Sequence, residues 1–238
     1  MTTVLLFRHG LTEMTGPVLA GWTPGVHLDE RGRSQADALA ERLRPVPLAA
    51  IVSSPLERCQ ETAQAVAAGR EQPGVATDER VGECHYGDWT GQSLKRLAKD
   101  RMWQVVQSHP SAAVFPGPEG EALRDVQNRA VGAIRDWNQA VGEHVAYAVC
   151  SHGDVIKAVV ADALGLHLDF FQRIQIDPGS LTAIRYTETR PFVLRLNDTG
   201  GDAAGLVPAE PKQRSRRSPW HRRGRASDAA VGGGSGNA

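Results

Sequence analysis

The sequence has few cysteines and no long apolar run near its start. Its three cysteines, Cys59, Cys84 and Cys150, are odd in number and include no Cys-x-x-Cys pair, which argues against a disulfide framework and against a zinc ribbon. The first apolar run, Val4 to Phe7, is too short for a signal-peptide core or a membrane span. We therefore expect a cytoplasmic protein with reduced thiols and no contact with a membrane.

Net charge is also absent, because 27 Lys and Arg balance 27 Asp and Glu in the 238 residues. Residues 208–238 nevertheless carry seven Lys or Arg against two Asp or Glu, which leaves 20 against 25 in the rest. This end of the chain is rich in Pro, Gly, Ser and Arg, so we expect residues 201–238 to be a disordered basic tail. A solvated extension is the first interpretation. Weak binding of nucleic acid or an acidic partner is the alternative, since Arg-rich runs bind phosphates without sequence preference.

Hydrophobic residues make up 41% of the chain, enough to bury a core. Their patterns predict alternating strands and helices. Strands are expected at residues 4–7, 49–53 and 146–150, a short one near 75–82, and two closing strands, antiparallel in one interpretation, at 181–187 and 192–196. Helices are expected around residues 36–43, 55–67, 93–107, 123–141 and 155–164. This alternation predicts one α/β domain, residues 1–200.

Two of the predicted strands end in a histidine followed by glycine. One leads into Arg8-His9-Gly10 and the other into Ser151-His152-Gly153. Ligands bind at the carboxyl ends of strands in open α/β sheets. A single histidine there would more often be a hydrogen-bonded loop residue, but two matching strand ends favour a functional site.

An arginine follows the second predicted strand. Ser54, with Glu57 three residues on and Pro55 at the first helical position, predicts a capping box that starts a helix. Arg58 would then lie in the first turn, where free backbone N–H groups and the helix dipole favour an anion. A solvated arginine is the alternative, but a place beside two histidines favours an anion ligand.

Glu83 is the candidate acid that would act with these arginines and histidines. Glu83 precedes a stretch with aromatic residues and glycines but no surface-helix pattern, and it could also cap a helix or pair with an arginine. Two arginines, two histidines and a carboxylate suit a phosphoryl group, which needs cationic forks for its oxygens, an imidazole that attacks phosphorus and an acid for the departing oxygen. No metal or cofactor is expected, because the spacing of Cys84, His85 and Cys150 fits no common metal site.

The chain resembles the histidine phosphatase superfamily, which includes cofactor-dependent phosphoglycerate mutases and related acid phosphatases. The matching pieces, within residues 3–196 and in the family's order, are Arg8-His9-Gly10, Leu28-Asp29-Glu30-Arg31-Gly32 with Gln35-Ala36, Ser53-Ser54-Pro55-Leu56-Glu57-Arg58 with Glu61-Thr62-Ala63, Glu83 with Gly87-Asp88-Trp89 and Gly91, and Ser151-His152-Gly153. The resemblance implies a phosphoglycerate mutase-like fold of the α/β class. This is a three-layer sandwich with a mostly parallel central sheet and helices on both faces.

The same resemblance implies a role for each site residue. His9 is the nucleophile that becomes phosphohistidine, and Glu83 is the proton donor. Arg8, Arg58 and His152 form the phosphate pocket. To attack, His9 must be neutral, with its other ring nitrogen bonded to a fixed acceptor, a backbone carbonyl in relatives. His152 is expected to be cationic near the charge that develops on the equatorial oxygens. Glu83, as a carboxylate, is then expected to help activate the water that cleaves the phosphohistidine.

Two positions need separate interpretation. Most relatives place an Asn that touches the phosphate soon after Arg-His-Gly, whereas residues 11–16 read Leu-Thr-Glu-Met-Thr-Gly. We expect Thr15, or the backbone N–H of Gly16, to replace that contact. Glu121 resembles a Gly-Glu step of the family, but helix capping explains it equally well.

Hydrolysis of a small phosphomonoester is the predicted activity. Mutases return the phosphoryl group to the released product, and their larger members carry an extended segment between the acid and the second histidine. Only 69 positions separate Glu83 from His152, and two predicted helices and a loop fill them. A phosphomutase is the runner-up. A non-catalytic phosphate-binding module is the alternative from another class, against which the complete set of reactive side chains speaks.

The pocket walls are expected from two loops, residues 13–26 with Trp22 and residues 109–119. Sugar phosphates, phosphoglycerates and nucleotide-precursor phosphates all fit what these loops offer. The sequence therefore predicts the class of substrate but neither its identity nor the oligomeric state.

Overall fold

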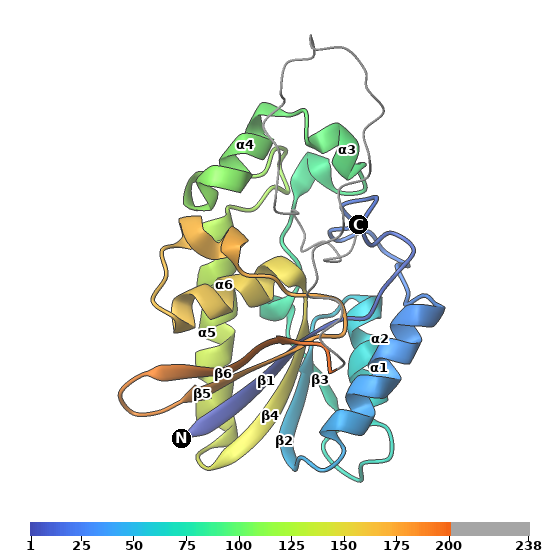
Figure 1. Cartoon of the computed structure of the whole chain (residues 1–238), viewed down its shortest axis with the longest axis vertical. Helices are drawn as coiled ribbons and strands as arrows, with labels where there is room; N and C mark the ends of the chain where they lie inside the picture. Colours follow the sequence, from blue (N-terminus) through green and yellow to red (C-terminus); the bar gives the residue numbers. More distant parts are fainter. Residues whose placement is uncertain (201–238) are drawn as a thin grey trace, which may run out of the picture.

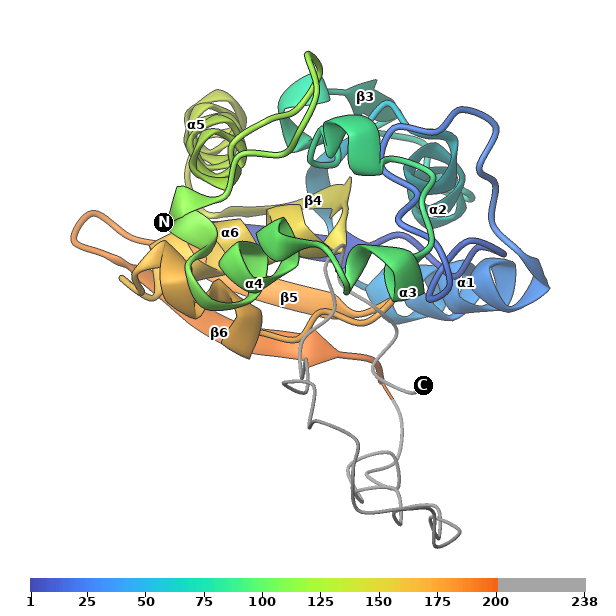
Figure 2. The same cartoon turned by 90° about the horizontal axis from the view of Figure 1, so that it is seen from above.

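A computed structural model of the chain describes residues 1–200, and these residues form a three-layer α/β structure (Figures 1 and 2). A six-stranded sheet has the order β3-β2-β4-β1-β5-β6. The strands are β1 (Thr2–Arg8), β2 (Leu48–Ser53), β3 (Val75–Thr77), β4 (Val145–Ser151), β5 (Leu181–Tyr186) and β6 (Pro191–Asp198). Strands β1 to β4 are parallel, and β5 pairs antiparallel with both of its neighbours, β1 and β6. The predicted fold class and the antiparallel pair of closing strands are confirmed.

Helices cover both faces of this sheet. They are α1 (Glu30–Leu43), α2 (Glu57–Ala67), α3 (Leu94–Leu97), α4 (Arg101–Ser108), α5 (Leu123–Val141) and α6 (Gly153–Ala163), with 3₁₀ turns η1 (Glu79–Val81), η2 (Gly87–Trp89), η3 (Pro110–Ala112) and η4 (Leu168–Arg173). Helices α1 and α2 pack on one face, while α5 and α6 pack on the other. The short helices α3 and α4 lie beyond the carboxyl edge of the strands, at the top of Figure 1.

The first strand shows why its sequence is apolar throughout. Leu5 and Phe7 belong to the core beneath α1 and α2, whereas Val4 and Leu6 belong to the core beneath α5 and α6. Successive side chains of a strand point to opposite faces, and a parallel strand covered on both faces has no polar side. The run is thus explained by burial on two sides.

Strand register sets the position of the site. Arg8 pairs with Ser151, and Ser53 pairs with Cys150. The carboxyl ends of β1, β2 and β4 therefore lie at one edge of the sheet. The segments that follow these three strands begin side by side, although they are far apart in the sequence.

The predicted capping box is wrong. Helix α2 begins at Glu57, its N-cap is Leu56, and no side chain caps it. The Glu57 carboxylate instead accepts from the Gly25 N–H at 3.0 Å. The Ser54 hydroxyl accepts from the Leu56 N–H at 3.3 Å and contacts the His152 ring. Both side chains have the residue types of a capping box but are engaged in tertiary contacts.

The single helix expected over residues 93–107 is also wrong, because the chain turns between α3 and α4. Asp100 caps the second of these helices, accepting from the Met102 N–H at 2.8 Å. A local side-chain cap can start a new helix at such a point, and apolar periodicity alone does not reveal the break.

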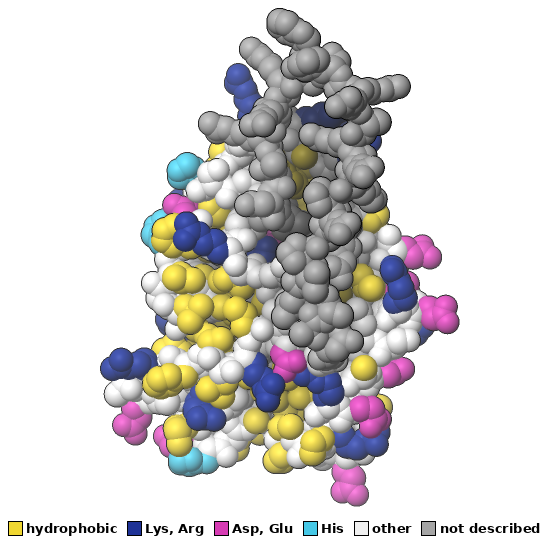
Figure 3. All heavy atoms as spheres, viewed as in Figure 1, with side chains coloured by type: hydrophobic (Ala, Val, Ile, Leu, Met, Phe, Trp, Pro, Cys, Tyr) yellow, Lys and Arg dark blue, Asp and Glu magenta, His cyan; other side chains and the backbone are white. Residues whose placement is uncertain are grey.

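Figure 3 shows hydrophobic side chains gathered on the molecular face over the region of α6 and η4. Exposed large hydrophobic residues in this region include Leu164, Leu166 and Phe170. Exposed apolar side chains are common on protein surfaces, so they assign no partner. No helix within residues 1–200 is long and apolar enough to cross a membrane. The tail predicted at residues 201–238 lies outside the described residues.

Candidate active site

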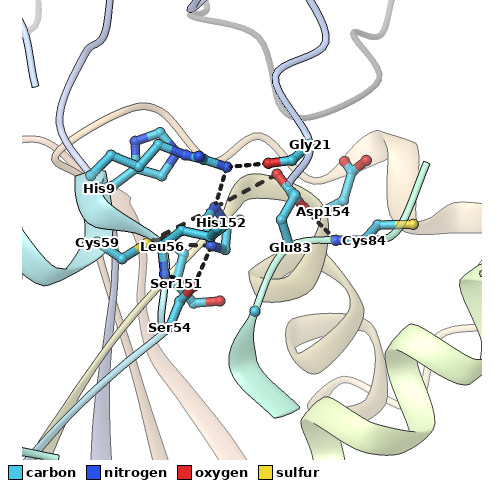
Figure 4. Close-up of polar contacts among 12 residues, drawn as sticks. His9, Gly21, Ser54, Leu56, Cys59, Glu83, Cys84, Ser151, His152 and Asp154 are labelled. Atoms are coloured by element: carbon cyan, nitrogen blue, oxygen red, sulfur yellow. Dashed lines mark hydrogen bonds and ion pairs between the residues drawn. The ribbon is translucent and has the colours of Figure 1, made fainter. Parts of the chain in front are cut away.

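Five predicted side chains meet at the carboxyl edge of the sheet and form the floor of a pocket; Figure 4 shows His9, Glu83 and His152 of this group. The five are Arg8, His9, Arg58, Glu83 and His152, and each is between 0% and 5% exposed. Arg8, His9, Arg58 and Glu83 line the pocket directly, and the fully buried His152 is the base of the floor. The two imidazole rings are 5.2 Å apart between centroids. Arg58 contacts both rings, and a Glu83 oxygen lies 3.7 Å from His152 Nδ1. The convergence expected from the sequence is present.

His9 is held in one tautomer by the backbone. Its Nδ1 lies 2.8 Å from the carbonyl oxygen of Gly10, and a carbonyl can only accept, so Nδ1 carries the proton. Nε2 therefore keeps its lone pair, and Arg58 Nε donates to it at 3.3 Å. Burial, together with the charges of Arg58 and Arg8, holds the pKa of His9 well below its usual value. The imidazole is thus neutral, as expected of an attacking group.

A close approach of two backbone segments sets the position of His9. A Cβ on Gly10 would lie 2.4 Å from the Gly32 carbonyl oxygen, and one on Gly32 would lie 2.0 Å from the Leu11 carbonyl oxygen. Asp29 caps α1 by accepting from the Gly32 N–H at 2.7 Å. Gly32 in the predicted motif of residues 28–32 thus lets the start of α1 pack against the segment that carries His9.

Arg58 lies in the first turn of α2 and reaches across the floor. Its Nη2 donates to the Gly21 carbonyl at 2.8 Å. Within the described part of the chain, its buried Nη1 has no hydrogen-bond partner. A buried N–H group without an acceptor is costly, and an anion above the floor would supply one. Arg8 is fixed separately, because its Nη1 donates to the Ile176 carbonyl at 2.8 Å.

Glu83 is a carboxyl group that holds its proton near neutral pH. Burial first, then the negative charge of Asp154, raise the pKa of Glu83 to about 7, against the opposing charges of Arg58 and Arg8. Its Oε1 accepts from the Cys84 N–H at 2.9 Å. At neutral pH this group is therefore able both to donate and to accept a proton.

His152 is fully buried at the base of the floor. Its Nε2 lies 2.8 Å from the Ser54 hydroxyl and 3.4 Å from Cys59 Sγ, while its Nδ1 lies 3.4 Å from Arg58 Nη2. Burial, then the charge of Arg58, with a smaller contribution from Arg8, hold the pKa of His152 well below its usual value. The ligand-free site therefore favours a neutral His152, because two arginines already occupy the same small space. A cationic His152 next to the developing charge of a phosphoryl group stays a prediction.

Asp154 is a functional neighbour that sequence reasoning missed. It lies in the first turn of α6, two residues after His152, and is fully buried beside Glu83 (Figure 4). Tyr86 donates its hydroxyl proton to Asp154 at 2.9 Å, and Lys157 Nζ lies 3.5 Å away. An acid among the buried apolar residues of one helix was the available signal.

The wall of the pocket comes from one loop and one short helix. Besides floor residues, the lining residues within residues 1–200 are Thr12, Met14, Thr15, Gly16, Val18, Leu19, Ala20, Gly21 and Leu94. The predicted loop therefore supplies most of the wall, although Trp22 is not among the lining residues. Segment 109–119 does not line the pocket, so that expectation is wrong. It packs behind η2 instead, where the Asp88 N–H donates to Pro116 at 2.8 Å.

Thr15 and Gly16 line the pocket as expected, but they differ in what they offer. The Thr15 hydroxyl is engaged with Thr12, accepting from its N–H at 3.1 Å and lying 2.9 Å from its hydroxyl. Gly16 has a φ of 102°, in the region that favours glycine. Of the two expected substitutes for the Asn contact, the Thr15 hydroxyl is already hydrogen-bonded to Thr12, which favours the backbone N–H of Gly16.

Glu121 does not cap helix α5, so the capping interpretation is wrong. The N-cap is Ala122, and no side chain bonds there. The Glu121 carboxylate binds Arg129 on the same side of the molecule as Glu83. No group of His, Cys, Asp and Glu within residues 1–200 has an arrangement suited to a metal ion.

Comparison with known proteins agrees with this geometry. Residues 4–199 match the family model of the histidine phosphatase superfamily (branch 1). The chain belongs to the histidine phosphatase superfamily. It is 32% identical to phosphoserine phosphatase 1 of Hydrogenobacter thermophilus over 84% of the chain and 93% of that protein. It is 27% identical to 2,3-bisphosphoglycerate-dependent phosphoglycerate mutase 2 of Gloeobacter violaceus over 74% of the chain and 82% of that protein.

A solved structure of the superfamily has the same fold. Bacillus stearothermophilus YhfR superimposes with a TM-score of 0.76 at 31% identity, over 83% of this chain and 98% of that one. The relatives include phosphatases and phosphomutases. This chain is accordingly an enzyme of the phosphatase or phosphomutase type.

Proposed function

We propose that the protein hydrolyses a small phosphomonoester through a phosphohistidine at His9. One observation carries the proposal: the neutral His9 ring keeps its Nε2 lone pair on the same floor as Glu83, a carboxyl group with a pKa of about 7. A nucleophile that needs no proton removed and an acid that still holds its proton are the two groups required to cleave a P–O bond to an alkoxide.

In the first step, His9 Nε2 forms a bond to phosphorus as the P–O bond to the leaving oxygen breaks. Glu83 gives its proton to that oxygen, so an alcohol departs. Arg8 and Arg58 face the charge that collects on the equatorial oxygens, and the backbone of Gly16 contacts the same group from the wall. A transition-state arginine is worth about 10³- to 10⁵-fold in other phosphoryl transfers.

In the second step, water replaces His9 on phosphorus. Glu83, now a carboxylate, accepts a proton from this water as the P–N bond breaks. The products are inorganic phosphate, neutral His9 and protonated Glu83, which restores the starting state. A phosphate dianion on the floor favours a second proton on the His152 ring, so this ring becomes a cation with two N–H donors when substrate is bound.

The pocket wall supports hydrolysis rather than phosphoryl return. Five lining residues outside the floor are apolar side chains: Met14, Val18, Leu19, Ala20 and Leu94. Within residues 1–200 the wall presents no Lys or Arg beyond the two floor arginines. A phosphomutase must retain an anionic product while the phosphoryl group returns, and such a wall offers it little attraction.

The proposal also covers the cellular compartment of the protein and its division into domains. The three cysteines are buried and free, which suits a reducing compartment, and we assign the protein to the cytoplasm. We assign the catalytic domain to residues 1–200 and treat residues 201–238 as an accessory segment.

The test is a single turnover in isotopically labelled water with a panel of phosphorylated metabolites. Hydrolysis through His9 places one water-derived oxygen in the released phosphate and gives an acid-labile phosphoenzyme that His9→Ala lacks. Phosphate that appears on a second substrate hydroxyl without water-derived oxygen would establish a phosphomutase. Binding of phosphate with no turnover of any substrate would establish a non-catalytic module.

A further inference from the structure

The backbone that carries Glu83 is tied down by one arginine. Arg129, on α5, donates from Nη1 to the carbonyls of Arg80 and Gly82, each at 2.8 Å. It donates from Nη2 to the carbonyl of Glu83 itself at 2.9 Å. One guanidinium thus holds three carbonyls of the short segment that ends at the acid.

A second side chain fixes this guanidinium. Glu121 accepts from Arg129 Nε at 2.7 Å and from Nη2 at 2.9 Å, and its Oε2 also accepts from the His85 N–H at 3.2 Å. The Arg129 and Glu121 side chains are only 20% and 15% exposed. A planar, two-point arginine–carboxylate pair restricts orientation as well as distance, so the segment is held on both sides of Glu83.

The wall loop joins the same network. Trp22 Nε1 donates to the Glu83 carbonyl at 2.7 Å, and the indole stacks on the His85 ring at 4.4 Å between centroids. The Glu83 carbonyl therefore accepts from Arg129 on one side and from the wall loop on the other. None of these contacts involves the carboxyl group that performs the chemistry.

We propose that Arg129, fixed by Glu121, is a positioning residue for the general acid Glu83. It acts through the Glu83 backbone and does not touch the substrate. The inference rests on the proposed function, because it presumes that Glu83 protonates the leaving oxygen. A displacement of about 1 Å from the productive geometry can cost about 10²-fold in rate, and loss of the clamp frees the acid to move by that much.

The leaving group provides a readout that a general loss of structure would not move. An alkoxide is strongly basic and needs the proton from Glu83 as the P–O bond breaks, whereas p-nitrophenolate departs without it. General acid catalysis contributes about 10²- to 10⁴-fold. A misplaced acid should therefore reduce kcat/KM for an alkyl phosphate far more than kcat/KM for p-nitrophenyl phosphate.

The experiment measures kcat/KM of the full chain with both substrates in Arg129→Lys, Glu121→Gln, Glu83→Gln and the double variant Glu83→Gln/Arg129→Lys. Lysine keeps the charge of Arg129 but cannot span three carbonyls and a carboxylate. Arg135→Lys is the matched control, because Arg135 is on the same helix and makes only a surface pair with Asp162 at 3.4 Å. Melting temperatures accompany each measurement.

We expect Arg129→Lys to lose about 10²-fold with the alkyl phosphate and only a few fold with the nitrophenyl ester. In the Glu83→Gln background the same change should have little further effect, because the two residues act as one unit. Glu121→Gln should show the same substrate dependence to a smaller degree, and it carries the test if the lysine variant fails to fold. The control should match the wild type.

Equal losses on both substrates, or effects of Arg129→Lys and Glu83→Gln that multiply, would overturn the positioning role while leaving the acid role of Glu83 intact. If Glu83→Gln itself lost both activities equally, Glu83 would not be the general acid. That result would overturn the proposed mechanism together with the inference drawn from it.

Discussion

The floor and the wall of the pocket are built in opposite ways. The floor takes its side chains from two strand ends, a helix start and a clamped segment, and every one of the five is buried and hydrogen-bonded or paired. The wall comes mainly from residues 12–21 and Leu94, with mostly apolar, partly exposed side chains. From this comparison we propose that the floor sets the reaction and the wall sets which leaving group fits.

The floor and the wall also differ in charge, because the floor carries ionisable side chains and the described part of the wall does not. Two arginines lower the pKa of both floor histidines, and the nearby carboxylates are Glu83, which is half protonated near neutral pH, and Asp154. An unliganded floor is therefore prepared for an anion. The wall contributes no ionised side chain among residues 1–200 and can act on the substrate only through shape and apolar contact.

Removal of the nucleophile should have the largest effect. We expect His9→Ala to reduce kcat by on the order of 10⁴-fold or more, as loss of a covalent nucleophile does in other enzymes, with little change in melting temperature. Steady-state kinetics and trapping of the phosphoenzyme measure it. Activity above one hundredth of the wild type would remove His9 from the reaction.

Arg58→Ala should cost about 10³-fold in kcat/KM, since it removes a cation from the transition state. It should also raise the pKa of His9, because the charge of Arg58 is one cause of its depression. The acid limb of the pH–rate profile should then move to higher pH. Arg42→Ala, which removes a pair with Asp198 at 2.9 Å at the end of the edge strand β6, is the control and should leave the profile unchanged.

The pH dependence tests the acid. With Glu83 required in its protonated form and a pKa of about 7, kcat/KM should fall as the pH rises through about 7. Asp154→Asn removes a negative charge that raises this pKa, so the fall should begin at lower pH. Tyr86→Phe removes the hydrogen bond to Asp154 but keeps its charge, and it should shift the limb less. A limb that stays in place in Asp154→Asn would contradict this account.

Substitutions in the wall should have smaller effects, and these should appear in KM and not in kcat. Leu94→Ala removes partly buried apolar surface worth about 1 kcal/mol, so KM should rise several fold while kcat stays the same. Val114→Ala lies in segment 109–119, which does not line the pocket, and Val114 is 52% exposed. It should leave KM unchanged. A rise in KM there would return that segment to the pocket wall.

The smallest effect concerns the basic segment. Deletion of residues 208–238 removes seven cationic side chains against two acidic ones and should leave kcat/KM for a small phosphomonoester unchanged. A large loss of activity, or a loss reversed by adding the segment as a peptide, would assign it a part in catalysis.

Local sequence patterns were sufficient to predict the floor residues, but not the residues that hold them in place. Arg8, His9 and His152 follow apolar strands directly, and the carboxyl ends of parallel strands meet at one edge, so their meeting could be predicted. The partnership of Arg129 with Glu121 was not predictable, because it joins a helix to a separate irregular segment and depends on how α5 packs. The capping box failed for a related reason: Ser54 and Glu57 are engaged by residues distant in the sequence.

The sequence by itself determined the fold class, the order of the main elements and the five side chains that meet at the carboxyl edge of the sheet, because these follow from burial on two sheet faces and from short motifs. Only the tertiary structure decided which residues line the wall, how the acid is held and which groups are charged. Those properties depend on distances between segments that are far apart in the chain, and on the burial that brings Asp154, Glu83 and two arginines into one space of low dielectric constant.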